Sequence, residues 1–161
     1  MMIAIFVAII TYVLYRKGKL KESTALSIPL LAFYLSFAVT VTIIERVTSA
    51  HPKYNLQVFW TYMSIAEGTT ELISEIFWNI VLFIPIGFLF SYIIPKKRWW
   101  LNAVSGMLIS SGIEIMQLVL HRGYFEFDDI IHNTFGTVIG IGIWVLVNLF
   151  LLSKITIFKQ K

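Results

Sequence analysis

Hydrophobic residues fall into five runs along the chain, separated by short polar segments. A transmembrane helix needs about 20 apolar residues, and the last four runs meet that length. The first run is shorter, so its length alone does not decide whether it crosses, although Arg16 and Lys17 could snorkel to the surface. We predict an all-α, polytopic membrane bundle of about five transmembrane helices over residues 1–15, 24–44, 76–94, 101–120 and 130–152.

Composition supports a membrane protein. The 161 residues are 58% hydrophobic and 14% charged, far from the average of soluble domains. We therefore predict one membrane domain over residues 1–161. The absence of cysteine excludes a disulfide framework and a thiolate metal site. The basic residues form short clusters between apolar runs, which indicates topology and gives no reason to expect a nucleic-acid partner.

The basic residues fall unequally on the two faces of such a bundle. Of the 13 Lys and Arg residues, one face would carry only Arg46, Lys53 and Arg122. Positive residues accumulate on the cytoplasmic side, so we predict the amino terminus outside and the carboxyl terminus in the cytoplasm. The cytoplasmic set is Arg16, Lys17, Lys19, Lys21, Lys96, Lys97, Arg98, Lys154, Lys159 and Lys161.

The long segment 47–74 is rich in aromatic residues, which predicts that it lies in or against the outer leaflet. Within it, Glu67, Glu71 and Glu75 recur every four residues and would share one helical face. A hydrated helix start is the favoured interpretation, and a face for a cation or another ligand is the alternative.

Polar residues at the end of the fourth run are the first candidates for a site. Glu114 and Gln117 are three residues apart and share a helical face. Glu114 lies about two helical turns inside the fourth run, and a carboxylate within the membrane must be paired, hydrated or protonated. Arg122, just beyond the run, could pair with it. The alternative is a hydrogen bond between packed helices without any ligand.

The fifth run begins with a second polar face. Asp128 or Asp129 suits the N-terminus of a helix, which would explain one of the two acids. Asn133 follows Asp129 on one face, together with Gly136 and Gly140. Small residues four apart allow close helix packing, within the chain or in a homo-oligomer.

The third run contributes Asn79 near its outer end, followed by Pro85 and Gly87, which predict a kink. Polar groups on several helices at one depth are the best argument for a shared outer pocket. The predicted ligand-binding residues are Asn79, Glu114, Gln117, Arg122, Asp128, Asp129 and Asn133, and the predicted structural residues are Pro85, Gly87, Gly136 and Gly140.

Other chemistries find little support. Glu114, His121, Asp129 and His132 could ligate a metal, but their spacing lacks the regularity of known sites, so no metal and no cofactor is predicted. Serines among glycines, without a nucleophile elbow, favour helix packing over nucleophilic catalysis.

Three segments resemble motifs of one known family. Residues 79–87 read NIVLFIPIG, similar to Asn-x-x-x-Phe-x-Pro-x-Gly; residues 113–117 read IEIMQ, similar to Glu-x-x-Gln; and residues 128–136 read DDIIHNTFG, similar to Asp-x-x-x-Asn-Thr-x-Gly. The chain thus resembles, over about residues 55–146, the VanZ-like family of bacterial membrane proteins, named for a teicoplanin-resistance accessory protein. It departs by one extra residue between Arg122 and the last motif, and by Val58 where proline is usual.

The resemblance implies a multi-pass protein of the bacterial cytoplasmic membrane that acts at its outer face. We predict a non-enzymatic protein whose pocket binds an envelope lipid or an amphiphilic lipoglycopeptide, and which contributes to teicoplanin-type resistance or envelope homeostasis. One alternative is an intramembrane enzyme acting on a lipid head group, with Glu114 as general acid or base. A small transporter is the other.

Overall fold

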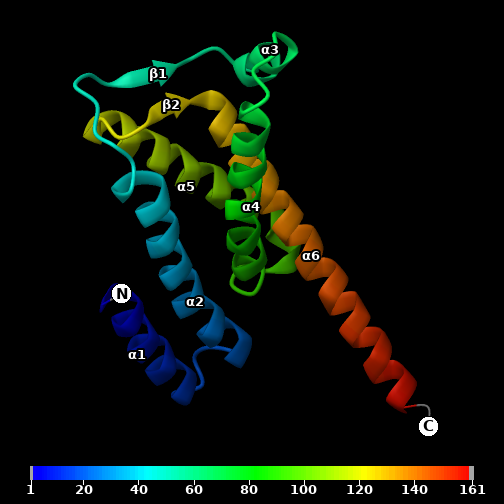
Figure 1. Cartoon of the computed structure of the whole chain (residues 1–161). Coiled ribbons are helices and arrows are strands. Elements are labelled where there is room, and N and C mark those ends of the chain that lie inside the picture. The colour runs from blue at the N-terminus through cyan, green and yellow to red at the C-terminus, as the bar shows by residue number, and fades with distance from the viewer. Residues whose placement is uncertain (1, 160–161) are drawn as a thin grey trace.

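The computed structural model describes residues 2–159, and the surroundings of side chains up to residue 151. The side chains of Lys154 and Lys159 therefore lie outside the described ones, and Lys161 lies outside the described residues altogether. Two short strands accompany a bundle of helices (Figure 1). The helices are α1 Met2–Arg16, α2 Glu22–Val39, α3 Trp60–Ala66, α4 Leu72–Phe90, α5 Trp99–Leu120 and α6 Phe127–Lys159.

Four helical segments are long and apolar enough to cross a membrane. They are Glu22–Ile44, Leu72–Phe90, Lys96–Leu120 and Phe127–Leu151. The first joins α2 to a π-helical turn, η1 Thr40–Ile44, and the third begins with a 3-10 turn, η2 Lys96–Arg98. The prediction of a multi-pass, all-α membrane bundle is confirmed. Helix α1 has 15 residues and is shorter than these four, so its crossing stays a prediction.

The two ends of the bundle differ in chemistry. In Figure 1 the α1–α2 link, the lower end of α4 and the last turns of α6 lie toward one end. The α1–α2 link carries the basic cluster that starts at Arg16, and η2 carries Lys96, Lys97 and Arg98. The opposite end holds both strands and α3. The charge segregation that predicts the orientation is thus a spatial one, while the orientation itself stays a prediction.

Helices α4 and α6 pack backbone to backbone. A Cβ atom added at Gly136 would overlap the Ile80 carbonyl oxygen, and one at Gly140 would overlap the Ile84 carbonyl oxygen. Gly87 meets the Thr137 backbone in the same way. The predicted packing role of these glycines therefore operates inside one chain. A homo-oligomer through Gly136 and Gly140 would need a face that α4 already covers, so an oligomer would have to use another surface.

Proline and a half-buried tyrosine mark the other side of α4. The helix continues through Pro85, although this residue cannot donate a backbone hydrogen bond. The Tyr34 hydroxyl of α2 donates to the Leu82 carbonyl at 3.0 Å, beside the carbonyl that Pro85 leaves free. A buried apolar cluster, which includes Leu31, Phe83 and Ile113, joins α2, α4 and α5 below this point.

The segment between α2 and α4 folds over the end of the bundle opposite the basic clusters. Strand β1 (Lys53–Asn55) pairs in parallel with β2 (Tyr124–Glu126), so that Asn55 lies opposite Glu126. Helix α3 follows. The prediction that Glu67, Glu71 and Glu75 share one helical face is wrong, because Gly68, at φ 109°, interrupts the helix after Glu67. Only Glu75 lies within the first turn of α4.

Candidate functional site

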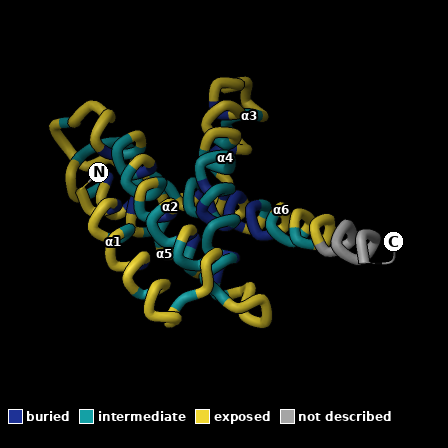
Figure 2. Tube along the Cα trace, turned by 90° about the horizontal axis from the view of Figure 1, so that it is seen from below, coloured by how far each residue is buried: buried dark blue, intermediate teal, exposed yellow. Residues whose placement is uncertain are grey.

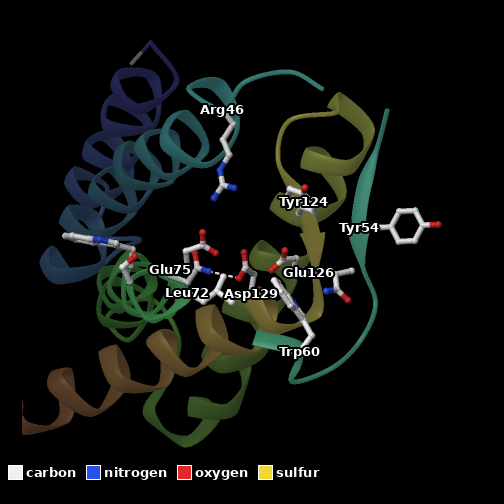
Figure 3. A pocket seen from close by; sticks show the side chains of 12 residues that line it. Arg46, Tyr54, Trp60, Leu72, Glu75, Tyr124, Glu126 and Asp129 are labelled. Atoms are coloured by element: carbon white, nitrogen blue, oxygen red, sulfur yellow. Dashed lines mark hydrogen bonds between the residues drawn. The ribbon is translucent and has the colours of Figure 1, made fainter. Parts of the chain in front are cut away.

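A cavity of about 650 Å³ opens beneath β1, β2 and α3 at the site end of the bundle. Figure 3 shows its charged side chains gathered from four separate parts of the chain. Its polar and aromatic lining consists of Arg46, Tyr54, Asn55, Trp60, Ser74, Glu75, Trp78, Asn79, Tyr124, Glu126 and Asp129. A space with one guanidinium, three carboxylates and several aromatic rings can bind a polar head group.

Asn79 and Asp129 form the floor contact of this cavity. The Asn79 amide donates to the Asp129 carboxylate at 2.6 Å, which ties α4 to the start of α6. The bond can be this short because Gly136 and Gly140 let α6 approach α4 closely. Both residues come from the predicted ligand-binding set, and both line the cavity.

Glu126 is the carboxylate that β2 contributes. The pKa of Glu126 is raised to about 7, mainly by burial and also by the negative charges of Asp129, Glu75 and Asp128, while the Trp60 indole opposes the rise. Its backbone N–H donates to the Glu114 carboxylate at 3.0 Å. The Glu126 side chain itself lines the cavity.

Arg46 is the residue that sequence reasoning missed. It follows the end of η1, and its guanidinium points across the cavity toward Glu75 and Asp129 (Figure 3). The available signal was its rarity, since it is one of three basic residues on the predicted outer face. Nothing in the sequence, however, places the end of the second span beside the third and fifth.

Glu114 has a supporting position. Its side chain is 1% exposed, and its carboxylate accepts the Glu126 backbone N–H, so it holds β2 against α5. It is not among the residues that line the cavity. A buried carboxylate can thus find its partner in the returning strand.

Gln117 and Arg122 both hold the end of the α2 segment. The Gln117 amide donates to the Thr42 carbonyl at 3.0 Å, and Arg122 donates to the Ile44 carbonyl at 2.5 Å. Carbonyls at a helix end need such partners, and a cation there also faces the negative end of the dipole. These contacts hold η1 in place, and so fix the position of the Arg46 backbone just after it.

Asp128 caps a helix other than its own. It is fully buried, and its two carboxylate oxygens accept the backbone N–H groups of Phe59 at 2.6 Å and Thr61 at 2.9 Å. It therefore anchors the start of α3, which carries Trp60 into the cavity lining. The predicted cap on the helix of the fifth span is therefore not the hydrogen-bonding role of Asp128, which caps α3 instead, and the neighbouring Asp129 is the acid in the cavity.

Asn133 lies below the cavity, between α6 and α5. It is 4% exposed and donates to the Ser110 hydroxyl at 2.8 Å. Figure 2 shows the buried residues where the helices pack against one another, whereas their outer faces are exposed. Of the seven predicted ligand-binding residues, Asn79 and Asp129 line the cavity, and the other five hold the elements around it.

The histidines considered for a metal lie in other surroundings. His132 makes a 2.9 Å hydrogen bond with the Tyr62 hydroxyl, and His121 ends α5 in the left-handed conformation. Within the described part of the chain, no group of three or more His, Asp or Glu side chains is arranged to hold a metal ion.

A second, apolar space adjoins the cavity. A groove of about 360 Å³ runs between α2 and α4, lined by Tyr34, Phe37, Val41 and Leu82 among others. Three of its lining residues, Arg46, Trp78 and Asn79, also line the polar cavity. The polar cavity and the apolar groove are therefore adjacent and share these three residues as a common boundary.

Apolar helices with a polar cavity at one end define a multi-pass membrane helix bundle. A comparison with family models agrees with this class and narrows it. The VanZ/LLP1 family model matches residues 2–150, nearly the whole described chain, and the protein belongs to this family. The match also takes in the first two helices, which precede the segment 55–146 that carries the motifs. No curated protein and no solved structure matches the chain.

Proposed function

We propose that this VanZ/LLP1 protein binds the head group of an envelope lipid or of an amphiphilic lipoglycopeptide antibiotic in an outer-leaflet pocket. It would lie in a bacterial cytoplasmic membrane with the cavity end outside, and contribute to teicoplanin-type resistance or envelope homeostasis. The observation that carries the proposal is the position of the charged cavity directly beside the apolar groove, with Arg46, Trp78 and Asn79 lining both. Ligand pockets combine apolar walls with a few convergent polar groups in this way.

The test uses Asp129→Ala in the full-length protein, because Asp129 lines the cavity and faces Asn79. Wild type expressed in a susceptible bacterium should raise the teicoplanin concentration needed to stop growth and should retain lipid on purification. Asp129→Ala, at equal expression, should lose both effects. Glu71→Gln is the matched control, since Glu71 is exposed and lies outside the lining. Unchanged resistance and lipid retention in Asp129→Ala would overturn the proposal.

One observation favours a second candidate, an intramembrane enzyme acting on a lipid head group. Glu126 lines the cavity with a pKa of about 7, which suits a general acid or base at neutral pH. It fits this role better than Glu114, the residue that the sequence favoured. Purified protein with labelled polyprenyl or phospholipid substrates should then give a product that Glu126→Gln abolishes, and an equal yield from that variant would exclude Glu126 as the catalytic group.

A further inference from the structure

The cavity and the groove have a polarity that runs in one direction. At one end, Phe37, Val41 and Leu82 line only the groove, and they lie within membrane-spanning segments. At the other end, Glu75, Glu126 and Asp129 line only the cavity. Arg46 lines both spaces and so stands at their junction. An occupant of the whole site meets apolar side chains first, then a cation, then carboxylates.

Arg46 faces the carboxylates across open space. In Figure 3 its guanidinium is directed toward Glu75 and Asp129. Among the described residues, however, it makes no hydrogen bond and no ion pair. Opposite charges that face each other across a cavity without contact leave room for a bridging ligand, which would be negative near Arg46 and positive near the acids. Arginine is well suited to the negative part, because its planar fork binds phosphate through two hydrogen bonds.

We propose that the two spaces together bind one aminophospholipid, a lipid with a phosphate followed by a primary amine. Its phosphate lies at Arg46, its ammonium group lies among Glu75, Glu126 and Asp129, and one acyl chain follows the groove along Phe37, Val41 and Leu82. The inference rests on the proposed function, lipid binding at the outer leaflet, and adds the chemical class of the lipid.

Head-group chemistry distinguishes this class from two common alternatives. The head group of phosphatidylglycerol would bring neutral hydroxyl groups, and no cation, toward three carboxylates. A choline head group carries the right charge and could stack on the aromatic rings, but it has no N–H to donate. A primary ammonium has three donors for the carboxylate oxygens. The site should therefore discriminate by the amine more than by the phosphate.

The experiment measures displacement of a fluorescent phosphatidylethanolamine from the purified full-length protein in detergent. The competitors are short-chain phosphatidylethanolamine, phosphatidylcholine and phosphatidylglycerol with identical acyl chains. We expect phosphatidylethanolamine to compete about tenfold better than either of the others, the difference that one charge-assisted hydrogen bond provides. Equal competition by phosphatidylcholine, or stronger competition by phosphatidylglycerol, would overturn the choice of an aminophospholipid and leave lipid binding itself intact.

Three variants test the three parts of the site separately. Arg46→Gln should weaken phosphatidylethanolamine and phosphatidylcholine alike, by about tenfold, because they share the phosphate. Glu75→Gln, on an exposed residue whose change should not disturb folding, should reduce the preference for the amine, and its control Glu71→Gln should not. Val41→Trp should weaken all three lipids by filling the groove.

The outcomes separate this inference from the proposed function. Binding of all three lipids with no preference, unchanged in Arg46→Gln and Glu75→Gln, would refute the head-group assignment alone. If none of the three lipids displaced the fluorescent probe, both the aminophospholipid assignment and the proposed lipid binding would be refuted. If Val41→Trp bound the lipids as tightly as the wild type, the acyl chain would not lie in the groove.

Discussion

Helix α4 is built in opposite ways on its two flanks. Toward α6, Gly136 and Gly140 let the two backbones touch and leave no space for even a methyl group. Toward α2, side chains hold the helices apart, with Tyr34 as the polar link and a groove of about 360 Å³ beside it. The same helix thus packs tightly on one side and lines an open groove on the other. The tight contact positions Asn79 against Asp129, and the looser one leaves the space in which we propose that a lipid binds.

The largest effect should come from breaking the closed flank with Gly136→Ala. The added methyl group would meet the Ile80 carbonyl, a backbone atom that cannot move aside without separating the helices. Overpacking of this kind costs about 1–3 kcal/mol, and the rigid obstacle places Gly136→Ala at the upper end. Thermal unfolding in detergent should show the loss. Gly142→Ala is the matched control, because it lies on the same helix with open space around it. Equal stability of the two variants would contradict the backbone contact.

A smaller effect should follow from removing the cap that holds the roof of the open flank. Asp128→Ala leaves the buried N–H groups of Phe59 and Thr61 without their carboxylate, and losing a helix cap costs about 0.5–2 kcal/mol. Limited proteolysis between α2 and α4 should become faster, and the thermal midpoint should fall. Asp129→Ala, one residue along, should lower stability less while abolishing lipid retention. The reverse order would mean that the two acids had been assigned to each other's roles.

These neighbouring acids show where sequence reasoning stops. Hydropathy locates the four long apolar segments to within a few residues, because membrane helices must satisfy their backbone groups internally and so keep a regular length. The period of a helix also places Asn133 and the glycines on one face of α6. Neither signal can distinguish Asp128 from Asp129. That distinction depends on the start of α3, which is distant from Asp128 in the sequence and contacts it only in the folded structure.

The charged lining was harder to predict for the same reason. Glu114, Gln117 and Arg122 stand out as polar residues at the end of an apolar run, and all three hold neighbouring backbone in place. Arg46 and Glu75 look like ordinary helix-end residues, and they enter the cavity only because the segment between α2 and α4 folds over it. Polar residues in apolar surroundings are conspicuous whether they support a site or line it, so rarity finds the region better than it finds the roles.

The smallest effect concerns pH, and it tests the open flank without disturbing the closed one. Glu126 has a pKa of about 7 in the fold against 4.5 ordinarily, with burial as the main cause and Asp129, Glu75 and Asp128 adding repulsion. The folded protein therefore binds a proton that the unfolded chain has released, so stability falls as pH rises from about 4.5 to about 7 and levels off above. Glu126→Gln should flatten part of this fall in a series of thermal midpoints, whereas Glu71→Gln should keep it. Because Glu126 is only half-buried, solvent screening limits the change to a few degrees at most.

An aminophospholipid should reduce the same pH dependence in the wild type, since its ammonium group favours the ionised carboxylate. A slope that neither Glu126→Gln nor the lipid alters would place the titrating group outside the cavity.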